Sequence, residues 1–343
     1  MVDSKQAPLD SAAAAKAAFA SVQDKPFPDD IFTAPELRWA VIGCGVIANQ
    51  MAQSLALAGR KLAGVANRTL SKAQAFAEQY GIEKVYESVE DLYADPGIDA
   101  VYITTPHNTH ITYLRDALAA GKHVLCEKAI TLNSAELDEA RAIADEHNVV
   151  LMDATTVLHM PLYQELRRRM DAGEFGRMNL AQLNFGSYKE YGDLTNRFYN
   201  RNLAGGAMLD IGVYALSVMR LFMASQPIEV VSLGNTCETG VDVAGGIVCR
   251  NAEQQLGVVS LTLHSKQPKR SIISFDKCYI EVNEYPRADH ATIVWTADGH
   301  REEVHAGTEP THCATRWPIL RRPLPATTPS ASCWIMLLML WSL

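Results

Sequence analysis

The sequence predicts an α/β fold in which a doubly wound parallel sheet is followed by an α+β part with a mostly antiparallel sheet. Two observations lead to this prediction. Between residues 37 and 152, short apolar runs alternate with segments of helical periodicity, as in parallel strands joined by helices. Beyond residue 153, apolar runs follow one another with few helices between them, which favours antiparallel pairing. We therefore expect an N-terminal arm at 1–36, domains at 37–152 and 153–308, and a tail at 309–343.

The composition is that of a globular protein with a sizeable core, since the 343 residues are 48% hydrophobic and 20% charged. A formal net charge of −8 disfavours nucleic acid and anionic membrane surfaces as partners. The seven cysteines include no C-x-x-C pair, which favours a reducing, cytoplasmic location and indicates no metal site. No basic leader precedes an apolar run, and no apolar stretch reaches about 18 residues, so the sequence predicts neither a signal peptide nor a membrane span.

Residues 37–48, L-R-W-A-V-I-G-C-G-V-I-A, organise the first part of the chain. The pattern predicts a buried strand at 39–42, a tight turn on two glycines, and a helix over 46–58. This is the G-x-G-x-x-A form of the dinucleotide fingerprint, in which the helix N-terminus offers free N–H groups to a pyrophosphate. The residues expected to form this cradle are Gly43, Gly45, Val46, Ile47 and Ala48. The alternative is an ordinary glycine-rich connection between a strand and a helix.

The end of the next strand, expected at 61–68, indicates which dinucleotide binds. Many NAD sites place an acidic residue there to hold the ribose 2′-hydroxyl. This chain instead has Asn67 and Arg68, followed by Lys72. These side chains suit a 2′-phosphate, so we predict NADP, with NAD as the other candidate. The alternative is that Arg68 is only a solvated residue at the end of a strand.

The pattern continues as an alternation of helices and strands up to residue 152. Helices are expected at 71–80, 88–94, 110–120 and 134–147, with Ser134 as a cap, and strands at 85–86, 99–104, 123–126 and 149–152. Ligands of open α/β sheets lie at the carboxyl ends of the strands. The candidate cofactor contacts at these ends are Thr105, Pro106, His107, His110, Glu127 and Lys128.

After residue 153 the pattern changes. Helices are expected at 161–172 and 205–223, and strands at 179–188, 228–235, 241–250, 256–263, 270–275, 279–283 and 292–296. Asp210 and Tyr214 are four positions apart on the apolar second helix, so both project from the same face.

These residues form a candidate catalytic set. Lys128 could hold a substrate hydroxyl and stabilise negative charge developing on its oxygen. A tyrosine hydroxyl is a weak base at neutral pH, and a nearby ammonium favours its ionised form, which makes Lys128 and Tyr214 a candidate acid/base pair. Asp210 would orient the lysine or the substrate. The alternatives are a surface lysine, a locally paired aspartate and a tyrosine that only packs in the core.

Three motifs together resemble the Gfo/Idh/MocA oxidoreductase family: G-C-G-V-I-A at 43–48, C-E-K-A at 126–129 and G-G-A-M-L-D-I-G-V-Y at 205–214. T-P-H-N-T-H at 105–110 is similar to another segment of that family. Tyr214 resembles the tyrosine of the branch that contains dimeric dihydrodiol dehydrogenases and glucose–fructose oxidoreductase. The resemblance implies a Rossmann domain and hydride transfer between NAD(P) and a hydroxyl or carbonyl carbon of a sugar, cyclitol or diol. The open sheet expected in the second domain offers a natural dimer face, so we expect a homo-oligomer. Ala129 departs from the family's usual E-K-P.

Several expectations remain open at this stage. Candidate substrate contacts, each with an equally good structural explanation, are His107, His110, Tyr188, Tyr191, Arg197 and Tyr199. A dinucleotide- and sugar-binding sensor without catalysis is the alternative function. A helix is expected at 11–19 in the arm. The tail is rich in proline, threonine and serine, which indicates either a translation-frame change and an impaired product or a genuine proline-rich tail.

Overall fold

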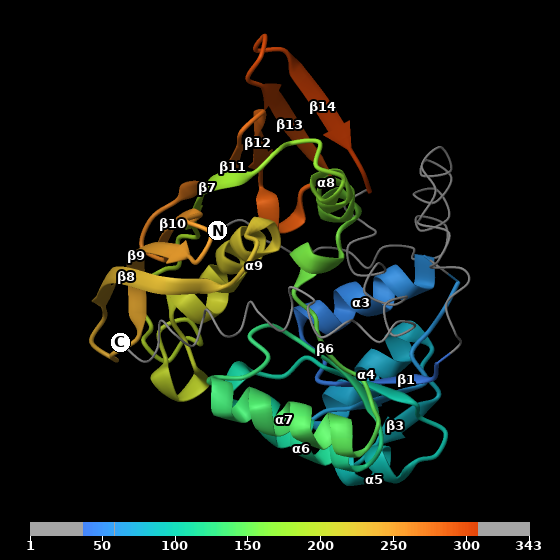
Figure 1. The fold of residues 1–343 in the computed structure, drawn as a ribbon. Helices are drawn as coiled ribbons and strands as arrows, with labels where there is room; N and C mark the ends of the chain where they lie inside the picture. Colours follow the sequence, from blue (N-terminus) through green and yellow to red (C-terminus); the bar gives the residue numbers. More distant parts are fainter. Residues whose placement is uncertain (1–36, 58, 308–343) are drawn as a thin grey trace, which may run out of the picture.

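The computed structural model describes residues 37–57 and 59–307 of the chain. The expected helix at 11–19, the arm and the tail lie outside the described residues. The strands of the described part form two sheets, one of six strands and one of eight (Figure 1).

The six-stranded sheet is parallel and has the order β3-β2-β1-β4-β5-β6, which is the doubly wound order of a Rossmann fold. Its strands are β1 (Trp39–Ile42), β2 (Gly64–Ala66), β3 (Lys84–Tyr86), β4 (Ala100–Ile103), β5 (His123–Cys126) and β6 (Leu151–Asp153). The strand expected at 61–68 is therefore much shorter. The chain order reverses between β1 and β4, and this is where such sheets bind their ligands.

Helices cover both faces of this sheet because side chains alternate along buried strands. In β1, Trp39 and Val41 pack in one cluster with α3 (Val46–Leu57) and α4 (Leu70–Tyr80). Ala40 and Ile42 pack on the other face, in a cluster with α5 (Val89–Ala94), α6 (His110–Ala119) and α7 (Ser134–Glu146). The sheet is thus buried on both sides, as its continuous apolar strands predict.

The helix ends follow local chemistry. Ser88 caps α5 by accepting a hydrogen bond from the Asp91 N–H, and Gly81 ends α4 with a φ of 65°. The expected cap at Ser134 is wrong. Asn133 caps α7 instead, since its side-chain oxygen accepts from the Glu136 N–H at 3.0 Å, and Ser134 is the first helical residue.

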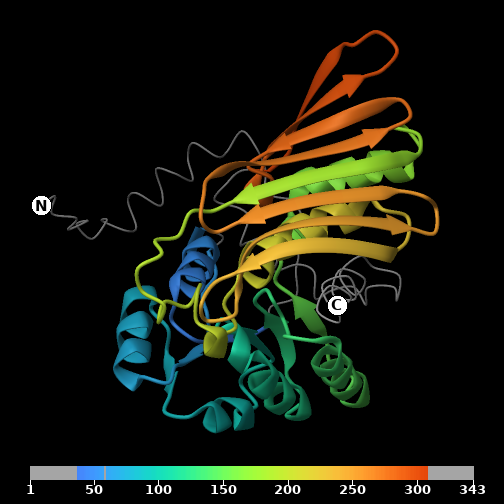
Figure 2. The same ribbon diagram turned by 90° about the vertical axis from the view of Figure 1, so that its left-hand side faces the viewer.

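The eight-stranded sheet has the order β14-β13-β12-β11-β7-β10-β9-β8 (Figure 2). Its strands are β7 (Met178–Gly186), β8 (Pro227–Thr236), β9 (Asp242–Asn251), β10 (Leu256–Thr262), β11 (Gln267–Phe275), β12 (Cys278–Asn283), β13 (His290–Trp295) and β14 (Arg301–His305). Neighbouring strands are antiparallel except β7 and β10, which confirms the mostly antiparallel prediction. The strand β14 was not predicted, because R-E-E-V-H is mostly charged.

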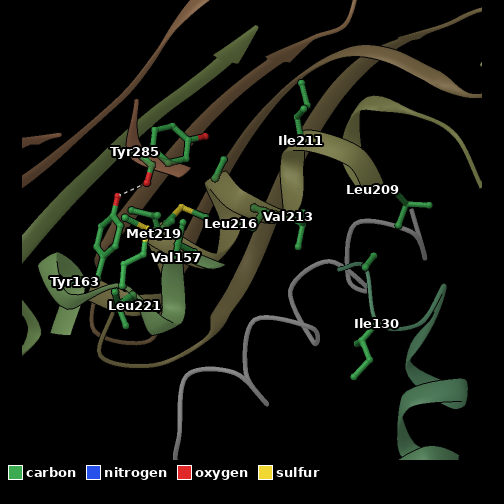
Figure 3. Close-up of a cluster of buried hydrophobic side chains, with 14 of the residues drawn as sticks. Ile130, Val157, Tyr163, Leu209, Ile211, Val213, Leu216, Met219, Leu221 and Tyr285 are labelled. Carbon is green, nitrogen blue, oxygen red and sulfur yellow. Dashed lines mark hydrogen bonds between the residues drawn. The ribbon is translucent and has the colours of Figure 1, made fainter. Parts of the chain in front are cut away.

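Helices α8 (Pro161–Asp171) and α9 (Val213–Phe222) lie on one face of this sheet (Figure 2). α9 packs against β7, β10 and β11. Figure 3 shows the apolar cluster beneath it, where the Tyr163 hydroxyl donates a hydrogen bond of 2.8 Å to the carbonyl of Tyr285. The segment Arg201–Phe222 is long and apolar enough to cross a membrane by length and composition, contrary to the expectation from sequence, but 61% of its apolar window is buried inside the protein. Its apolar character is therefore explained by the core.

Candidate functional site

The turn after β1 is built around Gly43. Its φ is 101°, which L-residues with a side chain rarely adopt, and a Cβ there would lie 2.7 Å from Thr104 Oγ1. The turn is held by hydrogen bonds from the Gly43 N–H to the Ala66 carbonyl (2.9 Å) and from the Thr104 hydroxyl to the Ile42 carbonyl (3.0 Å). β1, β2 and β4 therefore fix this turn at the switch point of the sheet.

The turn leads to an open helix N-terminus. The first helical hydrogen bond of α3 runs from the Asn49 N–H to the Gly45 carbonyl, so the N–H groups before it face out of the helix end. No atom lies within 4 Å of a Cβ built on Gly45, and Val46 is 73% exposed. Ala48 is fully buried against the sheet, whereas Ile47 is only partly buried. This open cradle fits the pyrophosphate of a dinucleotide.

The predicted ribose contacts lie between the end of β2 and the first turn of α4. The Asn67 side chain donates to the Thr69 carbonyl at 2.9 Å, which shapes the turn into α4. Arg68 and Lys72 are both exposed. The position thus offers two cations and no carboxylate at the strand end.

The loop after β4 holds Thr105, Pro106, His107 and His110. Pro106 is exposed and Thr105 is partly exposed. His107 is buried, with Nδ1 3.4 Å from the Ala204 carbonyl. The loop therefore contacts the segment that precedes the helix carrying Asp210 and Tyr214, residues 208–222, which we call the site helix.

His110 does not present a free polar atom to a cofactor or substrate. Its side chain is fully buried, with Nδ1 2.8 Å from the Ala129 carbonyl and Nε2 2.8 Å from the Thr105 carbonyl. The ring instead joins the loop after β4 to the loop after β5. This differs from the expected cofactor or substrate contact, and the reason is that both ring nitrogens face main-chain carbonyls of the protein itself.

Glu127 and Lys128 follow β5 but point to different surroundings. Glu127 is buried and accepts a hydrogen bond from the Tyr102 hydroxyl. The Lys128 ammonium donates to the Asp210 carbonyl at 2.8 Å and to Asp210 Oδ1 at 3.1 Å. Its side chain is only 13% exposed. The peptide bond between Lys128 and Ala129 is cis.

Asp210 lies in a π-helical turn, Met208–Gly212, that runs directly into α9. The sequence predicted an ordinary helix here. Asp242, on β9, accepts the Met208 N–H at 2.6 Å and thereby anchors the start of the turn. A Cβ on Gly206 would lie 2.2 Å from the Asp242 carboxylate, which explains the glycine. Asp242 was not among the predicted residues, since no sequence spacing links it to residue 210.

Tyr214 lies one turn further along, on the same side as Asp210. The Lys128 ammonium is 5.1 Å from the centre of the Tyr214 ring, and the Phe185 ring is 6.0 Å from it. The structure thus brings together Lys128, Asp210 and Tyr214, as the sequence predicts, although Lys128 follows a strand of the parallel sheet and the other two lie on the helix that packs on the eight-stranded sheet.

Electrostatics fix the charge states of this group. Burial lowers the pKa of Lys128, but the negative charges that Tyr214 and Asp210 carry when ionised outweigh burial and hold the pKa above 10.5. Burial raises the pKa of Asp210, but Lys128 and Arg197 outweigh it and hold the pKa below 3.8. Burial, followed by the Lys128 charge, lowers the pKa of His107. At neutral pH the site holds an ammonium, a carboxylate and a neutral imidazole.

The remaining candidate contacts lie between β7 and the site helix. Tyr188 and Tyr191 are 55% and 41% exposed, and the Tyr191 ring packs on Tyr199 at 5.0 Å. Tyr199 is fully buried and donates to the Lys189 carbonyl, so it supports the segment and is not open to a ligand. Arg197 Nη2 lies 3.4 Å from Asp210 Oδ1.

No group of three or more His, Cys, Asp or Glu side chains with the geometry of a metal site occurs in residues 37–57 and 59–307.

The chain is similar to curated dehydrogenases along most of its length. It is 32% identical over 254 residues to the trans-1,2-dihydrobenzene-1,2-diol dehydrogenase of Mus musculus, covering 72% of this chain and 75% of that protein. It is 36% identical over 210 residues to the enzyme of the same name from Homo sapiens, covering 60% of this chain and 62% of that protein.

Solved structures share the fold. A 3-ketoreductase from Actinomadura kijaniata, in complex with NADP and TDP-benzene, superposes with a TM-score of 0.74 at 24% identity, covering 88% of this chain and 94% of that one. An aldose–aldose oxidoreductase from Caulobacter crescentus, complexed with glycerol, gives a TM-score of 0.76 at 21% identity, covering 90% and 96%.

Two family models match in sequence order. The first, described as an oxidoreductase family with an NAD-binding Rossmann fold, matches residues 37–155. The second, the GFO/IDH/MocA C-terminal domain, matches residues 163–281. Together they cover more than half of the chain, and the chain therefore belongs to the Gfo/Idh/MocA family of NAD(P)-binding oxidoreductases.

Proposed function

We propose that this chain transfers a hydride between NADP and a hydroxyl or carbonyl carbon of a sugar, cyclitol or diol. One observation carries the proposal. The Lys128 ammonium stands at the carboxyl edge of the parallel sheet, 3.1 Å from Asp210 Oδ1 and 5.1 Å from the Tyr214 ring centre. The dinucleotide cradle on Gly43 and Gly45 lies at the same edge, because all strands of this sheet are parallel.

Each member of the group has a role in this proposal. Lys128, charged and partly desolvated, binds the substrate oxygen and stabilises the negative charge that develops on it during oxidation. Tyr214 accepts the hydroxyl proton in that direction and returns it during reduction. Asp210 holds the lysine in place through two hydrogen bonds. When bound, the nicotinamide supplies the hydride acceptor or donor.

Substitution of Lys128 tests this assignment. Lys128→Ala is expected to lower kcat/KM by at least 100-fold, since a removed oxyanion donor costs roughly that much. The affinity for NADPH, measured by fluorescence titration, should change far less. Turnover that survives the substitution would remove Lys128 from the mechanism. Tight NADPH binding by the wild-type chain, without turnover on a broad polyol panel, would favour the non-catalytic sensor.

The preference for NADP rests on Arg68 and Lys72. Both are exposed, Arg68 just after β2 and Lys72 in the first turn of α4, and the strand end carries no carboxylate that would repel a 2′-phosphate. Parallel titrations with NADPH and NADH test this. Arg68→Ala should weaken NADPH binding by roughly 10-fold, the worth of one charge-assisted contact, and leave NADH binding within about 2-fold. Equal losses for both dinucleotides would refute the preference.

The substrate class is supported by the relatives. Those similar in sequence are named diol dehydrogenases, and a structural neighbour is named an aldose–aldose oxidoreductase. The Ala129 departure gives no specific support to the sensor alternative, because Ala129 is fully buried and its carbonyl lies 2.8 Å from His110 Nδ1. The loop that carries Lys128 is thus held in place.

A homo-oligomer is also proposed, through the face of the eight-stranded sheet opposite α9 (Figure 2). Ile228, Val231 and Leu233 on β8 are 60%, 70% and 82% exposed, and Val248 on β9 is 47% exposed. Exposed apolar rows of this kind favour association, and a closed dimer would bury the same patch on both copies.

Location and domain limits complete the proposal. The five cysteines that the structure describes are free thiols, which supports the cytoplasm. Domains at 37–152 and 153–308 remain a proposal; the chain changes from one sheet to the other between β6, which ends at Asp153, and β7, which begins at Met178.

A further inference from the structure

A second group of charged side chains lies next to the proposed catalytic group. Lys189 follows β7, and Arg197 lies in the segment that leads to the site helix. Both contact one aromatic ring: the Lys189 ammonium and the Arg197 guanidinium carbon are each 4.3 Å from the centre of Phe198. Arg197 also lies 3.4 Å from Asp210, which binds Lys128. One chain of contacts therefore joins all three cations.

The charges of this group do not balance. Asp210 forms ion pairs with Lys128 and Arg197, and the buried Glu127 adds a second negative charge near Lys128. Three cations therefore face two carboxylates, in a chain with a net charge of −8. In residues 37–57 and 59–307, Lys189 forms no ion pair within 4 Å. A fourth cation nearby, Lys269, is neutralised by Glu284 at 2.6 Å.

The acidic residues of the same segment do not supply the missing charge. Asp193 accepts hydrogen bonds from the Thr195 N–H at 2.9 Å and the Thr195 hydroxyl at 2.6 Å, and Glu190 is exposed. Burial lowers the pKa of Lys189, and the positive charges of Arg197 and Lys128 lower it further, while Asp210 opposes them. An anionic group bound beside Lys189 would offset both its burial and the repulsion from the neighbouring positive charges.

We propose that Lys189 and Arg197 bind a carboxylate or phosphate group of the substrate, so that the substrate is an acidic sugar or polyol. This inference rests on the proposed function, since it names the substrate class of the same site. The reacting hydroxyl would contact Lys128, and the acidic group would lie toward Phe198. In the proposed function, the 2′-phosphate of the dinucleotide is assigned to the exposed Arg68 and Lys72, and its pyrophosphate to the N-terminus of α3.

The test uses matched ligands that differ only at one carbon: D-glucose, D-glucuronate and D-glucose 6-phosphate, with the corresponding galactose series. Calorimetric titration of the NADPH-loaded chain measures binding without turnover of the alcohols. We expect at least one acidic member to bind about 10-fold or more tightly than its neutral counterpart. The carboxylate and phosphate arms distinguish the two sources of the charge.

Variants locate the effect. Lys189→Gln should lower the ratio of acidic to neutral affinity about 10-fold, and Arg197→Lys should lower it less because the charge remains. Lys277→Gln is the matched control, since Lys277 is an exposed lysine in the connection between β11 and β12, where it contacts the Gly173 carbonyl. It should leave the ratio unchanged.

The outcomes separate this inference from the proposed function. Acid-selective binding that depends on Lys189, but without oxidation of any ligand by NADP, supports the anion site and contradicts hydride transfer from these compounds to NADP. If the chain oxidises or binds the neutral and the acidic sugars equally well, the anion site is overturned and the proposed oxidoreductase function stands. If Lys189→Gln loses affinity for NADPH, the lysine contacts the cofactor and the inference is overturned. The inference is also overturned if the wild-type chain binds NADPH but none of the six sugars.

Discussion

Replacing Gly43 by alanine is a sharp test of why the cradle has its sequence. Two costs add at this position. A side-chain residue at a φ of 101° costs about 1–3 kcal/mol, and the new Cβ would meet Thr104 Oγ1 at 2.7 Å, an overpacking that costs about 1–3 kcal/mol more. We therefore expect Gly43→Ala to lower the free energy of unfolding by about 2–6 kcal/mol, a large share of the 5–15 kcal/mol typical of proteins.

Gly45→Ala is the matched control, because no atom lies within 4 Å of its Cβ position and its φ is not positive. Urea unfolding, followed by circular dichroism and tryptophan fluorescence, should give a midpoint close to wild type for Gly45→Ala and a much lower one for Gly43→Ala. The NADPH affinity of Gly45→Ala should nevertheless fall, since its methyl group projects into the cradle. Equal midpoints for the two variants would refute the reasoning about Gly43.

A double variant separates the two costs. Thr104→Ala removes the hydroxyl that the new Cβ would meet, at the loss of one hydrogen bond to the Ile42 carbonyl worth about 1 kcal/mol. In the Gly43→Ala background it should recover the overpacking part, which gives a coupling energy of about 1–3 kcal/mol between the sites. Simple additivity would show that the backbone conformation accounts for the whole effect.

Three further predictions concern charge and assembly. The pKa of Asp210 lies below 3.8 in the folded chain, so the ionised carboxylate stabilises the folded state fully above that pH, and this stabilisation is lost as the pH falls through the folded-state pKa. The difference in unfolding free energy between wild type and Asp210→Asn, measured in urea titrations, should therefore shrink from pH 7 to pH 3. Arg169→Met should lower stability by about 1–3 kcal/mol, since a nearly buried guanidinium bridges two half-exposed glutamates, whereas Arg168→Met, at an exposed pair, should change it by less than about 1 kcal/mol. Val231→Lys combined with Leu233→Lys should convert a dimer to a monomer in light-scattering chromatography, and an unchanged mass would exclude this face as the interface.

The sequence predicted those parts of the fold that depend on a local pattern of apolar and polar residues. The order of strands and helices up to residue 153 follows from short buried runs alternating with amphipathic segments, and the structure confirms it. The failures are also local in origin. β14 is an edge strand with charged side chains, so it has no apolar pattern, and Asn133 and Ser134 are both good caps that only the observed geometry separates.

Other parts of the site depend on tertiary contacts that no local pattern encodes. Asp242 anchors the site helix from a strand that follows it in the sequence, and Lys189 acquires its significance only from the ring of Phe198 and its neighbours. His110 was predicted as a ligand contact because it follows a strand end. Its two ring nitrogens are instead held by carbonyls from two loops, which a sequence motif cannot distinguish from a binding role.

The position of Lys128 shows why the two sheets must act together. Its backbone leaves β5 of the parallel sheet, but its ammonium donates two hydrogen bonds to Asp210, at the start of the helix that packs on the other sheet. A shift of either part would break these bonds and leave a nearly buried ammonium without its partners, which is costly. The hydrogen bonds that place the lysine for chemistry therefore also join the two parts of the molecule, and substitutions at Asp210 should alter both turnover and the stability of their contact.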